Sequence, residues 1–210
     1  MIEAGKVTAV IGPSGAGKST LLGGIAGFYR QQHGRLLWKD SDITNLPPHQ
    51  RPVSMLFQDN NLFPHLTVLQ NVALALSSRS RVAPDVRAQV EDMLTRVGLG
   101  GLGERKPAAL SGGQQSRAAL ARALLQDREI MLMDEPFSAL GPALKTEMLD
   151  LSVGLSQDAG RTVVMVTHDP ADAARVADAI IGVAPNIAWP PIETTKFLRD
   201  PPEVFKSYLG

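Results

Sequence analysis

The sequence predicts an α/β fold with a mainly parallel sheet. Short apolar runs rich in β-branched residues alternate with helix-length segments, as in parallel sheets covered by helices. A glycine-rich loop joins the first of these strands, Val7–Ile11, to a helix expected over 19–26. Between residues 59 and 127 no strand-like run is present, and helical segments take its place. We therefore expect one domain over 1–210, with an α/β core (1–58 and 128–210) and an inserted helical subdomain (59–127).

The individual elements are expected from local signals. Pro47, Pro48 and Pro52 mark a loop between two early strands. Pro142 suits the first turn of a helix. The expected strands after the first are 35–38, 53–57, 130–133, 163–166 and 179–183. The expected helices after the first are 68–76, 85–97, one starting near 111, one starting near 142, and 171–177.

The composition is that of an ordinary globular chain. Of the 210 residues 44% are hydrophobic and 20% are charged, and 21 basic side chains balance 21 acidic ones. Because the charge is balanced, bulk attraction to nucleic acid is excluded, and we expect no nucleic-acid partner. The chain has no cysteine, which excludes disulfides, thiolate metal sites and thiol nucleophiles. No run of 18 apolar residues occurs, so we expect other chains to hold this one at any membrane.

The loop after the first strand fits the phosphate-binding pattern G-x-x-x-x-G-K-[ST] and lies between a strand and a helix, as that pattern requires. Its glycines let several backbone N–H groups face phosphate oxygens, and the following helix adds the positive end of its dipole. Lys18 can reach the β- and γ-phosphates, and the Ser19 hydroxyl can ligate Mg²⁺. The residues expected to bind a nucleoside triphosphate here are Gly12, Pro13, Ser14, Gly15, Ala16, Gly17, Lys18, Ser19 and Thr20.

Two acidic residues end the strand expected over 130–133. Asp134 lies at the carboxyl end of that strand, where ligands bind in open parallel sheets, and it can hold Mg²⁺ directly or through water. Glu135 follows and can orient and deprotonate an attacking water. His168 ends another strand on the same expected edge, and its position indicates a γ-phosphate contact. The alternatives are a solvated acidic turn for the pair and a capping or surface role for the histidine.

A second glycine-rich segment, residues 110–114, opens the helix that starts near 111. Taken alone, Ser111 is an N-cap at a flexible helix start. Ser-Gly-Gly at a helix N-terminus is also a phosphate-binding surface, because its backbone N–H groups are free. A site that already has a phosphate loop does not need a second phosphate-binding surface from the same chain. In two chains that face head to tail, the second surface of each chain would cover the nucleotide bound by the other.

The combined motifs resemble the ATPase subunits of ABC transporters. The motifs are GPSGAGKS (12–19), Gln58 after a strand, LSGGQ (110–114), IMLMDEP (130–136), SAL (138–140) and His168, in that family's order and at its spacings. Together they span the chain from residue 5 to about residue 183. Within the family, the segment 51–72 resembles the ATPases of bacterial thiamine importers.

The resemblance implies a Mg²⁺-dependent ATPase, an ABC-type enzyme that binds ATP and works as a head-to-tail homodimer. Ser111, Gly112 and Gly113 would contact the γ-phosphate bound by the partner subunit, with Gln114 nearby. Gln58 would sense Mg²⁺ and the attacking water, completing a catalytic set with Glu135 and His168 and a metal set with Ser19 and Asp134.

The resemblance also implies partners. Residues 60–67 would form much of a groove for membrane-spanning permease subunits, and Leu62, Phe63 and Leu66 suit such a surface, although they equally suit a core. A solute-binding protein would be an indirect partner. The expected location is peripheral, on the cytoplasmic face of the bacterial inner membrane.

Two positions depart from the family pattern. No aromatic residue that could stack on adenine precedes the first strand, so we expect a truncated N-terminal antiparallel β subdomain and weaker binding of the base. Gly141 stands where the family usually has Asp after Ser-Ala-Leu. The second hypothesis is therefore a weakly or non-catalytic nucleotide-binding subunit, and a third is an importer ATPase for another solute.

Overall fold

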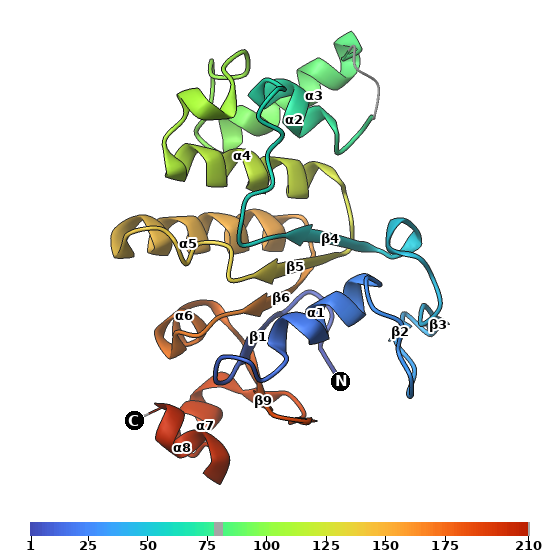
Figure 1. The fold of residues 1–210 in the computed structure, drawn as a ribbon, viewed down its shortest axis with the longest axis vertical. Coiled ribbons are helices and arrows are strands. Elements are labelled where there is room, and N and C mark those ends of the chain that lie inside the picture. Colours follow the sequence, from blue (N-terminus) through green and yellow to red (C-terminus); the bar gives the residue numbers. More distant parts are fainter. Residues whose placement is uncertain (78–81, 210) are drawn as a thin grey trace.

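A seven-stranded sheet forms the centre of the structure, a computed structural model that describes residues 1–77 and 82–209 (Figure 1). Its strands are β1 Val7–Ile11, β4 Val53–Leu56, β5 Ile130–Asp134, β6 Thr162–Val166, β7 Ala179–Ala184, β8 Ile187–Ala188 and β9 Ile192–Glu193. They lie in the order β4-β5-β6-β1-β7-β8, and β9 pairs with β7. The five strands from β4 to β7 in this order all pair in parallel, whereas β8 and β9 run antiparallel to β7. The predicted α/β fold with a mainly parallel sheet is confirmed.

Helices cover both faces of this sheet. The helices of the described residues are α1 Lys18–Ala26, α2 Val68–Ala73, α3 Pro84–Arg96, α4 Gly112–Leu125, α5 Pro142–Asp158, α6 Pro170–Val176, α7 Thr194–Arg199 and α8 Glu203–Leu209, with 3-10 turns at Pro48–Gln50 and Pro107–Ala109. In β6, Val164 and Val166 share a core cluster with Leu22 of α1, whereas Val163 and Met165 share one with Met148 of α5. The two-residue period of a strand thus places α1 and α5 on opposite faces. In 1–77 and 82–209, no helix has the length and apolar character needed to cross a membrane.

The helices α2, α3 and α4 pack on one another beyond the β4 edge of the sheet, at the top of Figure 1. The described residues between 59 and 127 contain no strand, as the sequence predicts. Small buried residues, Ala118 and Ala121 among them, line α4 and permit close packing. Thr67 and Gln70 form a capping box that starts α2, which ends at Ala73, three residues before its predicted end.

A small antiparallel sheet, β2 Leu37–Trp38 and β3 Ser41–Asp42, lies apart from the main one. Lys39 and Asp40 form its turn with positive φ values of 47° and 65°, as a two-residue hairpin turn requires. The strand predicted over 35–38 is shorter than expected, because the amide of Leu36 donates to the Thr44 hydroxyl instead of a strand partner.

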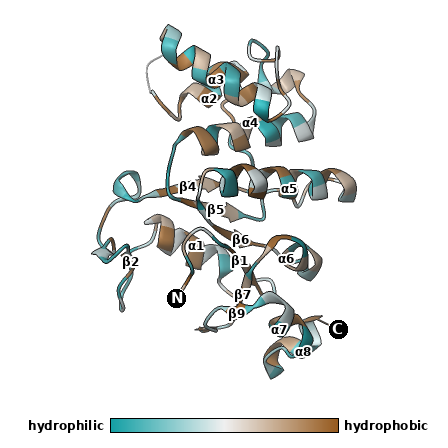
Figure 2. Cartoon of the chain, turned by 180° about the vertical axis from the view of Figure 1, so that it is seen from behind, coloured by the Kyte–Doolittle hydropathy of each residue, from teal (hydrophilic) through white to brown (hydrophobic). Residues whose placement is uncertain are grey.

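No element is expected from the sequence after residue 183, and this part of the prediction is incomplete. In the structure, Asn186 (φ 63°) turns the chain between β7 and β8, and β9, α7 and α8 follow. Phe197 and Phe205 from the two helices are buried against β7, where Gly182 leaves room for the Phe205 ring. Figure 2 shows the large sheet mainly in hydrophobic brown, with teal segments on helices and loops.

Candidate active site

Four neighbouring strands bring the predicted site residues, apart from Ser111 to Gln114, to one edge of the sheet. At their carboxyl ends, β4 leads to Gln58, β5 to Asp134 and Glu135, β6 to His168, and β1 to the phosphate loop over 12–19. This is the edge at which open parallel sheets bind their ligands. Residues far apart in the sequence therefore become neighbours because their strands pair.

The phosphate loop folds around the ammonium group of Lys18. This residue is only 6% exposed, and its Nζ donates to the backbone carbonyl oxygens of Gly12 at 2.9 Å and Pro13 at 3.1 Å. Gly15 and Gly17 adopt φ values of 78° and 98°, which favour glycine. The first N–H groups of α1 have no partner within the helix, so the loop and helix start form an anion site.

Gly12 is required by packing as well as by conformation. Its φ is 153°, and a Cβ atom built on it collides with the backbone carbonyl oxygen of Val183 in β7. Because that oxygen belongs to the main chain of a central strand, a side chain at position 12 forces the loop or the strand to move. The phosphate loop therefore packs directly against β7 at this position.

The Ser19 hydroxyl donates to Oδ1 of Asp134 at 2.9 Å. Burial raises the pKa of Asp134. The hydrogen bond from Ser19 lowers this pKa, and the negative charge of Glu135 raises it further. The described residues hold no group of three or more histidine and acidic side chains that could enclose a metal ion. One carboxylate and one hydroxyl beside a phosphate loop do fit Mg²⁺, which proteins bind through one or two carboxylates together with substrate phosphates.

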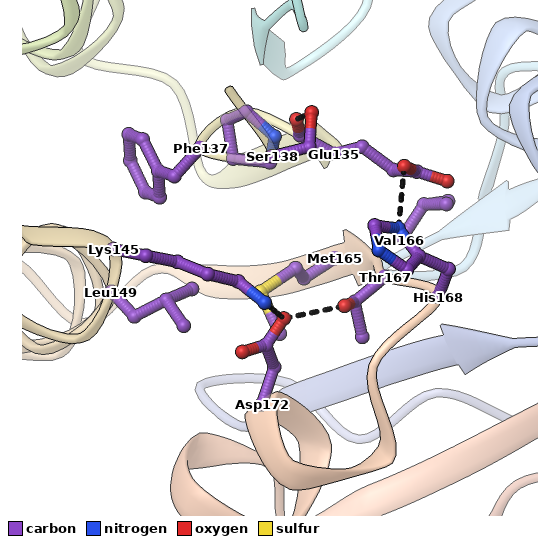
Figure 3. A pocket seen from close by; sticks show the side chains of 11 residues that line it. Glu135, Phe137, Ser138, Lys145, Leu149, Met165, Val166, Thr167, His168 and Asp172 are labelled. Carbon is purple, nitrogen blue, oxygen red and sulfur yellow. Dashed lines mark hydrogen bonds and ion pairs between the residues drawn. The ribbon is translucent and has the colours of Figure 1, made fainter. Parts of the chain in front are cut away.

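Glu135 and His168 point toward one another across the site (Figure 3). Oε2 of Glu135 lies 2.8 Å from Nδ1 of His168. Since an ionised carboxylate only accepts hydrogen bonds, Nδ1 carries the proton in this contact. Glu135 has a positive φ of 44°, and the Ser138 hydroxyl donates to its carbonyl oxygen at 3.1 Å. The side chain of Glu135 is 23% exposed and that of His168 54%, so both remain open to a ligand.

Two further residues, which no sequence motif marks, hold this region. The hydroxyl of Tyr208, in α8, donates to the carbonyl oxygen of His168 at 2.6 Å. Lys145, in α5, binds the carboxylates of Asp169 and Asp172 just beyond His168. No local motif marks either residue, because their partners lie on other elements.

Gln58 is exposed at the end of β4, and the loop after it is fastened to the helical layer. Arg122 of α4 donates to the carbonyl oxygens of Asn60 and Asn61, each at 2.8 Å. Of the predicted docking residues, Leu62 packs partly against the main core, whereas Phe63 is 47% exposed.

A groove of about 340 Å³ lies beside this loop. Phe28 and Phe57 stack with ring centroids 6.1 Å apart on its wall, and Phe28 is half exposed. The remaining lining residues are Ala26, Pro48, His49, Val53, Met55, Ala75, Gln126 and Arg128. The groove thus lies between the core and the helical layer, immediately before Gln58.

The segment predicted to serve a partner subunit opens α4. Ser111 is the N-cap, with its hydroxyl accepting from Gln114 N at 3.3 Å and its own N–H donating to Gln114 Oε1 at 3.0 Å. Ser111 and Gly112 are exposed, whereas Gly113 packs against Leu144. In Figure 1 the start of α4 and the phosphate loop lie apart, with α5 between their levels. The structure therefore does not bring these two segments together within one chain.

A family model described as "ABC transporter" matches residues 1–138. The chain belongs to the ABC transporter family, as an ATP-binding subunit, and the ATP-binding subunits of this family are ATPases. The resemblance drawn from the sequence motifs is thus confirmed.

Its relatives carry a more specific name, "Thiamine import ATP-binding protein ThiQ". The chain is 57% identical to that of Ruegeria sp. (strain TM1040), covering 100% of this chain and 90% of the relative. The relative from Cereibacter sphaeroides is 56% identical, covering 99% of this chain and 90% of the relative. The relative from Brucella suis biovar 1 is 48% identical, covering 100% of this chain and 87% of the relative. Among solved structures, cbiO1 from Clostridium perfringens, "part of the ABC transporter complex cbiONQ", has a TM-score of 0.83 at 26% identity, covering 95% of this chain and 81% of that one.

Proposed function

We propose that this chain hydrolyses ATP at the edge formed by β1, β5 and β6 and thereby drives thiamine import. The observation that carries the proposal is the placement of two pairs, Ser19 with Asp134 and Glu135 with His168, directly beside the phosphate loop. Full-length identity to relatives named for thiamine import supports the solute.

In this proposal the loop residues 12–20 bind the phosphates and Lys18 turns from its backbone acceptors toward the β- and γ-phosphates. Glu135 accepts a proton from water as the water oxygen attacks the γ-phosphorus, the bond to the β-phosphate oxygen breaks, and ADP leaves. His168 contacts the γ-phosphate through Nε2.

Ser19 and Asp134 would hold Mg²⁺, with Gln58 as a further contact. The ion supplies charge neutralisation at the transferred phosphoryl group when bound. The protein's own contribution at this point is orientation: the Ser19 hydroxyl and Asp134 are already within hydrogen-bond distance of each other. Both the Ser19 hydroxyl oxygen and the Asp134 carboxylate oxygen could then bind one Mg²⁺ ion with little movement of either side chain.

We also propose a head-to-tail dimer. Ser111, Gly112, Gly113 and Gln114 of one copy would contact the γ-phosphate bound by the other, because they lie away from the phosphate loop of their own chain (Figure 1). The capping box occupies the N–H groups of Ser111 and Gln114, so the amides of Gly112 and Gly113 and the positive end of the helix dipole would make the contact.

For transport, we propose that permease subunits dock on the surface after Gln58, formed by residues 60–67, together with the adjacent groove lined by Phe28 and Phe57. Its position next to Gln58 and between the core (1–58 and 128–210) and a helical subdomain (59–127) suits transmission of motion to the site. The chain would lie peripherally at the cytoplasmic face of the inner membrane, with a solute-binding protein as indirect partner.

The solute is tested by uptake of labelled thiamine in a strain that lacks the gene for this chain. We expect plasmid-borne wild-type chain to restore uptake and the Glu135→Gln variant not to restore it. Restoration by both would favour a non-catalytic subunit, and thiamine uptake that the deletion leaves unimpaired would point to another solute.

A further inference from the structure

Lys145, in the first turns of α5, reaches toward the start of α6 (Figure 3). Its Nζ lies 2.8 Å from Oδ2 of Asp172 and 2.9 Å from Oδ2 of Asp169. The side chains of Lys145 and Asp172 are only 18% and 10% exposed. Burial disfavours the charged ammonium, but the hydrogen bonds to both carboxylates outweigh it and raise the pKa of Lys145. One well-shielded cation is thus shared by two carboxylates.

These carboxylates hold the residues on either side of His168. The Thr167 hydroxyl donates at 2.6 Å to the same Asp172 oxygen that binds Lys145. The Asp169 amide in turn donates to the Thr167 hydroxyl at 3.0 Å. Thr167 and Asp172 are 5% and 8% exposed, so water competes little for these bonds. The backbone before and after His168 therefore belongs to one network centred on Lys145.

The His168 ring itself has little support. Its side chain is 54% exposed, and its contact in the described structure is the 2.8 Å bond to Glu135. When a functional side chain is open to solvent, its direction depends on how its backbone is held. Backbone movement at Thr167 or Asp169 would therefore change the orientation of the His168 ring.

We infer that Lys145 is a positioning residue for the ATPase reaction: through Asp169, Asp172 and Thr167 it sets the backbone at His168 so that the imidazole meets Glu135. The inference rests on the proposed function, because it takes Glu135 and His168 as participants in hydrolysis. Lys145 itself touches neither of them in the structure's hydrogen bonds and ion pairs.

A plain clamp between α5 and α6 is the competing role, and the chain contains a matched control for it. Arg175 of α6 binds Asp150 of α5 through two hydrogen bonds of 2.7 Å and 2.6 Å. That pair joins the same two helices but makes no hydrogen bond to residues 167–169. A loss that comes only from loosening α5 against α6 should therefore follow removal of either cation.

The test compares steady-state ATP hydrolysis by the full chain and by its Lys145→Met, Lys145→Arg and Arg175→Met variants. We expect Lys145→Met to lower kcat by about tenfold or more, with KM for ATP changed less than about twofold, since small misplacements of a catalytic group cost rate and not uniform binding. Arg175→Met should stay within about twofold of wild type, and Lys145→Arg should recover most of the lost rate, because a guanidinium also bridges two carboxylates.

A spectroscopic measurement reports the positioning directly. In ¹⁵N-labelled chain, the His168 ring signals, assigned with a His168→Asn variant, should move in Lys145→Met and stay in place in Arg175→Met. Equal kcat losses in the two variants, or an unmoved His168 signal in Lys145→Met, would overturn the inference. A wild-type chain without ATPase activity would instead refute the proposed function, and the ring signals would still test the positioning.

Discussion

The hydroxyl of Ser19 donates to the carboxylate of Asp134 across 115 residues of sequence, at 2.9 Å. This bond joins the first turn of α1 to the end of β5, and it brings together two of the protein oxygens proposed to bind Mg²⁺. Replacing Ser19 with alanine removes one of these oxygens and leaves Asp134 without the bond that opposes its raised pKa.

For Ser19→Ala we therefore expect the Mg²⁺ concentration at half-maximal ATPase rate to rise roughly ten- to a hundredfold, the range for losing a group that supports a metal. The measurement is a Mg²⁺ titration of ATP hydrolysis. Thr95→Ala is the control, because it removes a hydroxyl that only bonds within α3. An unchanged midpoint in Ser19→Ala would contradict the assignment.

Gly12→Ala should damage the phosphate loop. A Cβ at this position collides with the Val183 carbonyl oxygen, and overpacking of this kind costs about 1–3 kcal/mol. We expect a lower free energy of unfolding and weaker ATP binding, measured by urea denaturation and by nucleotide titration. Gly154→Ala, in an open position of α5, should instead stabilise by up to about 1 kcal/mol. Equal effects of the two substitutions would be inconsistent with the close packing at Gly12.

The pair of Lys145 and Asp169 predicts a specific pH dependence of stability. The hydrogen bond from Lys145 is the main cause that holds the pKa of Asp169 below its usual 3.8. A depressed carboxyl pKa stabilises the fold above the unfolded value, and this contribution disappears as the pH falls through the folded value. The difference in Tm between wild type and Lys145→Met should hold from pH 7 to pH 5 and shrink below 3.8.

Thermal melts over this range check the prediction. Lys206→Met removes an exposed ion pair with Glu203 in α8 and should show a small difference in Tm throughout. A Lys145→Met difference that grows toward acid pH would have the wrong sign for this account.

Tyr208→Phe should lower stability by about 1 kcal/mol or more, the usual net worth of a hydrogen bond, because the hydroxyl loses its bond to the His168 carbonyl oxygen and its contact with the backbone of Gly12. The ring remains, so its packing is unchanged. Tyr29, whose ring is exposed, provides a control through Tyr29→Phe, for which we expect almost no change. Urea denaturation of the three chains makes the comparison, and identical midpoints would show that the Tyr208 bond contributes nothing.

Much of the fold follows from the sequence because its central strands carry strong local signals. β6 and β7 are runs of β-branched and other apolar residues, β6 bounded by Arg161 and Thr167 and β7 by Asp178 and Pro185. The elements after β7 lack such signals: β8 and β9 have two residues each, and α7 and α8 are short. What holds them is tertiary, namely the packing of Phe197 and Phe205 against Gly182.

The site divides in the same way. The phosphate loop is a local motif, so its residues are predictable from their spacing. Glu135 and His168 follow the ends of β5 and β6, and the pairing of these two strands explains why they meet. Lys145 and Tyr208 lie 24 and 40 residues from Asp169 and His168, their partners. Such contacts depend on how helices dock on the sheet, which no spacing rule encodes.

The most direct test of the central claim is ATP hydrolysis by the purified chain with Mg²⁺, compared with its Glu135→Gln variant, with ATP binding measured on both. We predict that the variant binds ATP as tightly as wild type and hydrolyses it about 10²- to 10⁴-fold more slowly, the contribution of a positioned general base. Equal hydrolysis rates in the two chains, with ATP still bound, would contradict the account.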